Sequence, residues 1–137
     1  MSSVFVDTNI LIYSYSATEI DKRKASHDIL SGPGIVLNTQ VINEFIWVMH
    51  RKYSIDLKYL HQVVRNLYAS FTIGIIGREV IEKALVLTGK YGYSYWDSLI
   101  LSYAIENQCD LVYTEDLQHG QIIEKKVKII NPFLENK

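Results

Sequence analysis

The sequence predicts an α/β protein, a three-layer α/β/α sandwich with a central, mainly parallel sheet of about five strands. Short, fully apolar segments alternate with segments of helical length along the chain. Strands without a polar side are typical of parallel sheets whose two faces are both covered by helices. The chain has 137 residues, of which 48% are apolar and 21% are charged, and this size fits one domain. We therefore expect residues 1–137 to form a single domain.

The first half of the chain is predicted to contain two strands and four helices. Each strand is a short β-rich run, and the first helix follows its strand without the Gly or Pro of a hairpin. Gly32-Pro33-Gly34 separates the second helix from the second strand. In chain order we expect a strand at 4–6, helices at 10–13 and 16–30, a strand at 35–37, and helices at 39–51 and 57–70.

The second half of the chain is predicted to contain three strands and two helices. Ser94 is expected to begin the second of these helices, after an aromatic loop, Gly89-Lys90-Tyr91-Gly92-Tyr93. In chain order we expect a strand at 72–76, a helix at 79–88, the loop at 89–93, a helix from 94 to about 107, and strands at 111–114 and 127–130.

Composition excludes several classes of function. The net charge of −1 excludes a protein that binds polyanions through bulk charge. The single cysteine, Cys109, excludes an intramolecular disulfide, and with four scattered histidines it forms no structural zinc motif. No apolar run approaches the roughly 18 residues that cross a bilayer, and the first residues do not resemble a secretory signal. We expect a cytoplasmic protein with no membrane role.

Two acidic residues follow predicted strands. Asp7 comes directly after the first strand, and Asp116 lies two residues beyond Thr114 at the end of the fourth. The carboxyl ends of parallel strands meet at one edge of a sheet, which is where α/β proteins bind ligands. Each acid also has a structural explanation, because Asp7 is a good helix N-cap and Asp116 a common turn residue.

Two further acids lie on predicted helices. On a helical wheel, Glu44 falls at the edge of an apolar arc beside Trp47, and Asp97 falls near the middle of the apolar stripe of its own helix. An inward carboxylate needs a cation, hydrogen-bond donors or a proton. A capping box at Ser94-Tyr95-Trp96-Asp97 is the competing explanation for Asp97. The basic residues that offer an ordinary ion pair to one of these acids are Lys90, Arg51 and Arg65.

A shared site is the simplest account of acids from four separate segments. Carboxylates without nearby Cys or His are the ligands of hard divalent ions, Mg²⁺ or Mn²⁺, rather than zinc. Such ions activate water and stabilise the attacking and leaving oxygens of a phosphodiester. The sequence therefore predicts metal-dependent phosphodiester hydrolysis.

Short motifs across nearly the whole chain resemble those of the PIN-domain nucleases, and the length and the closing Asn-Pro-Phe are most similar to the VapC-type toxins of toxin–antitoxin modules. The matching segments are Phe5-Val6-Asp7-Thr8-Asn9-Ile10-Leu11, Asn43-Glu44-Phe45, Tyr95-Trp96-Asp97-Ser98-Leu99-Ile100, Thr114-Glu115-Asp116 and Ile130-Asn131-Pro132-Phe133.

The resemblance implies an Mg²⁺- or Mn²⁺-dependent endoribonuclease. It implies that Asp7, Glu44, Asp97 and Asp116 are the catalytic, metal-binding acids, with Glu115 as an alternative to the last of them. It further implies that Thr8, Asn9 and Thr114 support the site through hydrogen bonds. A homodimer and an antitoxin partner are implied as well. A housekeeping nuclease that processes RNA is the alternative within the same family.

Candidate contacts to RNA lie outside the acidic set. Setting aside the four acids leaves 11 acids against 14 bases, a net charge of +3. Basic runs are usually solvated helix faces, but they can also bind phosphates. Four aromatic residues precede Asp97 closely in sequence, and exposed rings there could stack on bases: Tyr91, Tyr93, Tyr95 and Trp96. Core packing is nevertheless the expected role of Trp96. The candidates for substrate binding are Lys22, Arg23, Lys24, Arg51, Lys52 and Tyr93.

Two rival functions predict different chemistry. A haloacid-dehalogenase-like phosphatase also begins with an aspartate after its first strand, but it needs a second aspartate two residues later as general acid, where this chain has Asn9. A non-catalytic module that binds RNA or protein does not need the acids, and all four are present.

Overall fold

In the computed structural model, which describes residues 2–134, the central sheet has six strands in the order β3-β2-β1-β4-β6-β5. All neighbouring pairs are parallel except β5 and β6. This confirms the predicted α/β fold with a mainly parallel sheet. The strands are β1 (Ser3–Val6), β2 (Ile35–Asn38), β3 (Thr72–Gly74), β4 (Cys109–Tyr113), β5 (Ile122–Ile123) and β6 (Val127–Ile130).

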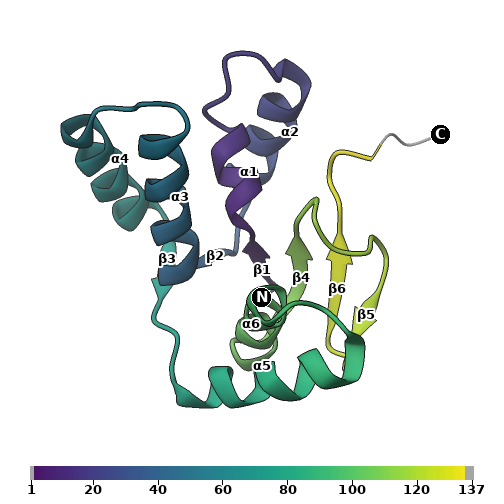
Figure 1. The fold of residues 1–137 in the computed structure, drawn as a ribbon. Helices are drawn as coiled ribbons and strands as arrows, with labels where there is room; N and C mark the ends of the chain where they lie inside the picture. The colour runs from purple at the N-terminus through teal and green to yellow at the C-terminus, as the bar shows by residue number, and fades with distance from the viewer. Residues whose placement is uncertain (1, 135–137) are drawn as a thin grey trace.

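Helices cover the sheet on both sides, as Figure 1 shows: α1 to α4 gather on one side, and α5 and α6 lie on the other. Right-handed crossovers explain this division, since the chain moves outward from β1 to β3 and then returns across the sheet to β4. The helices are α1 (Thr8–Tyr13), α2 (Ile20–Leu30), α3 (Thr39–Arg51), α4 (Leu57–Ser70), α5 (Arg78–Tyr91) and α6 (Tyr95–Glu106).

Side-chain caps fix where four of these helices begin. Asp7 caps α1, Asn38 caps α3 by accepting a hydrogen bond from Val41 N at 3.0 Å, and Asp56 caps α4. Ser94 caps α6 through its hydroxyl oxygen, which accepts from Asp97 N at 3.2 Å. Each cap satisfies a backbone N–H that has no partner within its helix.

Three expected elements differ from the structure. The sheet has a sixth, two-residue strand, β5, which is too short to give a periodic pattern. Helix α5 continues through Gly89, Lys90 and Tyr91, so the expected aromatic loop is reduced to residues 92–94. The helix ends instead at Gly92, whose φ of 79° favours glycine. Helix α2 begins at Ile20 rather than near Ser16, whose hydroxyl caps a turn before it.

The core lies between the sheet and both helical layers. Phe5 and Val6 of β1 and Val112 of β4 are fully buried, and Phe5 packs against Tyr103 of α6 with ring centroids 5.6 Å apart. Within the described part of the chain, no helix is both long and apolar enough to cross a bilayer.

The strand order reverses next to β1, which pairs with β2 on one side and β4 on the other. In open α/β sheets, the crevice beyond the carboxyl ends of two such strands is the usual ligand site. Asp7 follows β1 directly, and Thr114 follows β4 directly. Both residues therefore lie at the topological switch point.

Candidate metal and substrate site

Asp7 is anchored at this switch point by two hydrogen bonds. Its Oδ1 accepts from Thr8 N at 2.7 Å, and its Oδ2 accepts from the Thr114 hydroxyl at 2.8 Å. The first bond is the helix cap that the sequence offered as a structural explanation. The second links the end of β1 to the end of β4, which a cap does not require. Asp7 is only 5% exposed, so its carboxylate has a fixed position.

Asp116 is joined to Asp7 through Asn9 and Thr114. The Asn9 side-chain amide donates to Asp116 Oδ2 at 3.0 Å and to Thr114 Oγ1 at 3.3 Å. Asp116 N also donates to Thr114 Oγ1, at 3.2 Å. Asn9 thus contacts Asp116, and Thr114 contacts both Asp7 and Asp116. Thr8 supplies its backbone N–H to Asp7, and its buried hydroxyl oxygen has no hydrogen-bond partner among the described residues.

Glu44 and Asp97 approach the same region from α3 and α6. The negative charge of Asp97 raises the pKa of Glu44, as does that of Asp116, and the charge of Glu44 in turn raises the pKa of Asp7. These interactions connect all four acids. No Lys, Arg or His within residues 2–134 forms an ion pair with any of them. Lys90 pairs with Glu124 instead, and the Arg51 guanidinium lies over Trp47.

The expected burial of the two helical acids is only partly correct. Glu44 is exposed as a residue and Asp97 is half-buried. The fully buried positions of α3 form a narrower stripe than the wheel suggested, namely Val41, Ile42, Phe45 and Met49. Asp97 lies in the first turn of α6, just before the eight consecutive buried residues that begin at Ser98.

The competing explanations for Asp97 are resolved in part. Ser94 caps α6, as the capping box predicts. However, no hydrogen bond from Ser94 N to the Asp97 carboxylate is found in the described residues. The Asp97 carboxylate therefore keeps its acceptor capacity, and it acts on Glu44 through its charge.

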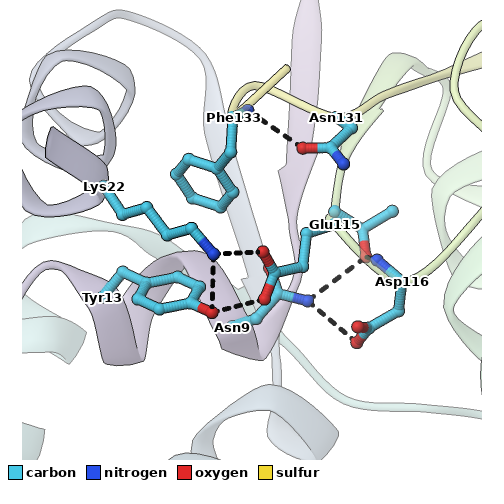
Figure 2. Close-up of polar contacts among 8 residues, drawn as sticks. Asn9, Tyr13, Lys22, Glu115, Asp116, Asn131 and Phe133 are labelled. Atoms are coloured by element: carbon cyan, nitrogen blue, oxygen red, sulfur yellow. Dashed lines mark hydrogen bonds and ion pairs between the residues drawn. The ribbon is translucent and has the colours of Figure 1, made fainter. Parts of the chain in front are cut away.

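The Glu115 side chain points toward Lys22 and Tyr13, whereas that of Asp116 points toward Asn9, as Figure 2 shows. Its carboxylate accepts from Lys22 Nζ at 3.0 Å and from the Tyr13 hydroxyl, and Lys22 Nζ also donates to Tyr13 at 3.2 Å. The ammonium group lies 4.6 Å from the Tyr13 ring centroid and 5.4 Å from that of Phe133. Of the two neighbouring acids, Asp116 is consequently the one in contact with Asn9.

Burial and charge raise the pKa of two site acids. Burial is the main reason why the pKa of Asp7 rises from its usual 3.8 to about 7, and the charges of Glu44 and Asp116 contribute. Hydrogen bonds from Thr114 and Thr8 oppose this rise. Glu44 also has a raised pKa, chiefly because part of its carboxyl group is desolvated, and the charges of Asp97 and Asp116 add to this rise. A nearby cation would favour the charged form of both acids.

The donor set fits a hard divalent ion. It consists of carboxylate oxygens together with two buried oxygens, Thr8 Oγ1 and Asn9 Oδ1, that lack hydrogen-bond partners among the described residues. Oxygen ligands of this kind suit Mg²⁺ and Mn²⁺. Within residues 2–134, however, no group of three or more His, Cys, Asp or Glu side chains is already arranged around one point. Metal ligation by Asp7, Glu44, Asp97 and Asp116 therefore stays a prediction.

Three of the six candidate RNA contacts have hydrogen-bond or ion-pair partners within the protein. Lys22 pairs with Glu115, and the Arg23 guanidinium donates to Ser16 O at 3.3 Å. Lys24, Arg51 and Lys52 are exposed. Tyr93 is half-buried, and its hydroxyl contacts Gln121 and Gln118.

The expected core packing of Trp96 is wrong, because its side chain is 65% exposed. It lies two residues before the buried part of α6, which begins at Ser98. Tyr91, Tyr93 and Tyr95 are the residues of this segment that pack against the core. Sequence reasoning did not predict the cluster of Lys22, Tyr13 and Glu115, because these residues are far apart in sequence and no local pattern indicates their contact.

Of the four acids, Glu44 lines an open cleft of about 740 Å³ between α3 and α6. A larger hollow of about 810 Å³ lies among Ser3, Ile35 and Thr72, at the amino ends of the strands, and it contains no acid. The chemistry of the switch point therefore favours the first cleft as the candidate substrate site.

The fold defines a protein of the three-layer α/β class, with Asp7 and Asp116 linked through Thr114 and Asn9 at the switch point of a mainly parallel sheet. A family model described as the PIN domain matches residues 4–125. The chain therefore belongs to the PIN domain family. A comparison with curated protein sequences finds no match.

Several solved structures share this fold. A toxin–antitoxin complex from Klebsiella pneumoniae is similar with a TM-score of 0.72 and 23% identity, covering 96% of this chain and 98% of the other. VapC20 from Mycobacterium tuberculosis, described as a toxin that cleaves the sarcin–ricin loop, has a TM-score of 0.68 and 15% identity, covering 83% and 92%. DNA-bound VapBC from Salmonella typhimurium has a TM-score of 0.62 and 16% identity, covering 94% and 97%.

Proposed function

We propose that this protein is an endoribonuclease dependent on Mg²⁺ or Mn²⁺, and that it is the toxin of a toxin–antitoxin module. The observation that carries the proposal is that Glu44 links Asp7, Asp97 and Asp116 through charge, with no counter-cation in residues 2–134, beside the switch point of a PIN domain. Repulsion among these acids is costly unless a cation or protons offset it. A divalent ion explains why they are kept together.

Asp7, Glu44, Asp97 and Asp116 would hold the ion. When bound, it would supply an activated water and neutralise charge on the scissile phosphate. Thr114 and Asn9 position the carboxylates of Asp7 and Asp116, because their hydrogen bonds fix two otherwise separate loops relative to each other. Asn9 is a donor to Asp116, and a neutral amide cannot act as the general acid that a haloacid-dehalogenase-like phosphatase needs at this position.

The toxin assignment is supported by the comparisons. One of the similar structures is described as a toxin–antitoxin complex, one as DNA-bound VapBC, and one as a toxin that cleaves the sarcin–ricin loop. We propose by analogy that this chain forms a homodimer and is inhibited by an antitoxin in the cytoplasm. The exposed apolar residues of α5, Ile81, Leu85 and Val86, are available for such contacts.

The nuclease proposal is tested by incubating the purified protein with total RNA, with Mg²⁺ or with EDTA, and mapping the cleaved ends. We expect internal cleavage that EDTA abolishes. Asp7→Asn and Asp97→Asn should each abolish cleavage while the protein stays folded. The matched control is Asp28→Asn, which removes an exposed acid of α2 that lies outside the site. Full, EDTA-sensitive activity in both site variants would refute the assignment.

A separate experiment distinguishes a toxin from an RNA-processing enzyme. Expression of the chain alone should arrest growth. Co-expression of the protein encoded by an adjacent short reading frame should restore growth, and the two proteins should co-purify. Analytical ultracentrifugation of the purified chain measures its mass in solution and so tests the homodimer. Efficient cleavage without growth arrest would favour the processing role. Turnover of p-nitrophenyl phosphate with RNA left intact would instead favour a phosphatase.

A further inference from the structure

The cleft beside the acidic site has aromatic walls. Its lining includes Asn43, Glu44 and Trp47 of α3, Ile76 of the loop after β3, and Trp96 and Leu99 of α6. We propose that this cleft is a subsite in which an unpaired base of the RNA stacks on the indole rings of Trp47 and Trp96. The inference rests on the proposed nuclease function and names the class of its substrate, single-stranded or looped RNA.

Exposure of the two tryptophans is the first observation. Trp47 and Trp96 are 62% and 65% exposed, more than any other aromatic residue in the described part of the chain. Leaving a large aromatic ring in water forgoes a substantial hydrophobic gain. Two such rings in one cleft therefore indicate a surface that a planar, apolar-faced ligand covers.

The polar groups of the cleft match the edges of a base. Gln40 and Asn43 line it together with the tryptophans, and side-chain amides can both donate to and accept from base edges. Gln40 Oε1 is buried and has no hydrogen-bond partner among the described residues. A base amino group would satisfy this oxygen.

Charge around the cleft favours a nucleic acid over an apolar protein segment. The Arg51 guanidinium lies 5.0 Å from the Trp47 ring centroid, where it can meet a backbone phosphate while the ring meets a base. Glu44 belongs both to the cleft and to the acidic set. A base in the cleft would thus place the neighbouring phosphodiester beside the acids.

The geometry selects unpaired RNA. Bases within a duplex are stacked on their neighbours, so their faces are not available to protein rings, whereas bases in loops and single strands can be splayed out. Stacking is tolerant of sequence because every base has a π-face. The subsite should therefore prefer unpaired over paired RNA more strongly than it prefers one base over another.

Intrinsic fluorescence tests the proposal directly, because Trp47 and Trp96 are the only two tryptophans in the chain. Asp7→Asn protein with Mg²⁺ would be titrated with a labelled single-stranded oligoribonucleotide of about 12 nucleotides, and with the same strand annealed to its complement. Label anisotropy reports binding, and tryptophan emission reports stacking. We expect saturable quenching with the single strand and much weaker quenching with the duplex. Binding of the single strand without any change in tryptophan emission would overturn the proposal.

Steady-state cleavage of the same oligonucleotide by the otherwise unaltered protein tests the functional consequence. Trp47→Ala and Trp96→Ala should each raise KM about tenfold with a smaller effect on kcat, and Trp→Phe at either position should restore much of the loss. The matched control is Tyr68→Ala, since Tyr68 of α4 is also exposed but does not line the cleft.

The outcomes separate this inference from the proposed function. Unchanged KM in both alanine variants, with cleavage intact, would overturn the stacking subsite and leave the nuclease in place. A second possible result is that Trp47→Ala still arrests growth but no longer binds the co-purified protein. This result would show that the cleft serves a protein partner, and it would also overturn the stacking subsite. Saturable quenching without any metal-dependent cleavage would support the subsite and refute the nuclease.

Discussion

Thr114 is the residue on which the geometry of the candidate site depends most. Its hydroxyl donates to Asp7 Oδ2 and accepts from both Asn9 Nδ2 and Asp116 N. One small side chain thereby fixes the end of β1, the first turn of α1 and the loop after β4 relative to one another. Thr114→Val keeps the shape and removes all three bonds, so we expect lower activity together with a loss of about 1–3 kcal/mol of stability. Nuclease assays and urea unfolding measure the two effects, and Thr114→Ser should retain most of both.

Asp7 should make the stability of the metal-free protein depend on pH. The pKa of Asp7 is about 7 in the folded protein and 3.8 when unperturbed, so between these values the folded state binds more protons than the unfolded state. Its contribution is therefore fully present below about pH 4 and is lost as the pH rises through 7. One pKa unit corresponds to about 1.4 kcal/mol, so the loss amounts to a few kcal/mol at most.

Urea unfolding in EDTA on either side of pH 7 checks this prediction. The difference in unfolding free energy between Asp7→Asn and the unaltered protein should grow in favour of the variant as the pH increases, because the amide carries no charge. Glu44, whose pKa is also raised, contributes in the same direction and remains in both proteins. Parallel pH profiles for the two proteins would contradict the raised pKa of Asp7.

The sequence predicted the position of strand-end residues better than the exposure of residues on helices. Asp7, Thr114 and Asp116 could be placed at one sheet edge because strand ends in a parallel sheet converge whatever the details of packing. The exposure of Glu44 and Trp96 depends on how far neighbouring elements cover α3 and the first turn of α6. That coverage is a tertiary property, and a helical wheel of one segment does not contain it.

At the scale of elements, the ion pair between Lys22 and Glu115 joins α2 to the loop after β4. The two side chains are 32% and 24% exposed, so removing one charge leaves the other poorly solvated. Lys22→Met should destabilise the protein by about 1–3 kcal/mol. The double variant Lys22→Met with Glu115→Gln should recover part of this loss, because the unpaired charge is then gone. Thermal unfolding of the three variants measures the recovery, and an additive double variant would show that the pair is not coupled.

Close packing between β3 and α6 leads to a second prediction about elements. A Cβ atom at Gly74 would lie 1.8 Å from the Tyr103 hydroxyl oxygen and 3.0 Å from Tyr103 Cζ. Gly74→Ala therefore forces β3 away from α6, at an expected cost of about 1–3 kcal/mol. Tyr103→Phe removes the closest atom, so Gly74→Ala should cost less in that background. Chemical denaturation of all four proteins gives the coupling energy, and equal costs in both backgrounds would be inconsistent with this contact.

The elements themselves were largely predictable because their signals are local. Apolar runs, the cap Ser94 and the breaker Gly32-Pro33-Gly34 placed the long helices and the inner strands near their observed bounds. The exceptions lack a local signal of sufficient strength. Strand β5 has two residues and pairs only with β6, and Gly89 lies within α5 because Gly92, not Gly89, adopts the left-handed conformation that ends the helix.

At the scale of the whole molecule, binding of a divalent ion should be visible as global stability, since an ion held only by the folded state shifts the unfolding equilibrium. We expect Mn²⁺ at about a hundred times its dissociation constant to raise the free energy of unfolding by about 2.7 kcal/mol. Asp28→Asn should keep this increase, and Asp7→Asn should lose most of it. Calorimetry with Mn²⁺ and with EDTA provides the measurement.

The stabilisation by Mn²⁺ should increase with pH, whereas the contribution of Asp7 to the stability of the metal-free protein decreases with pH. Asp7, with a pKa of about 7, is mostly protonated one unit below that value, so the ion must displace a proton before it can bind. One unit above, the carboxylate is already charged and the repulsion among the acids is relieved by the ion. Stabilisation by Mn²⁺ should therefore be larger at about pH 8 than at about pH 6. An equal stabilisation at both values would mean that the ion binds without contacting Asp7, and the acidic set would then need another explanation.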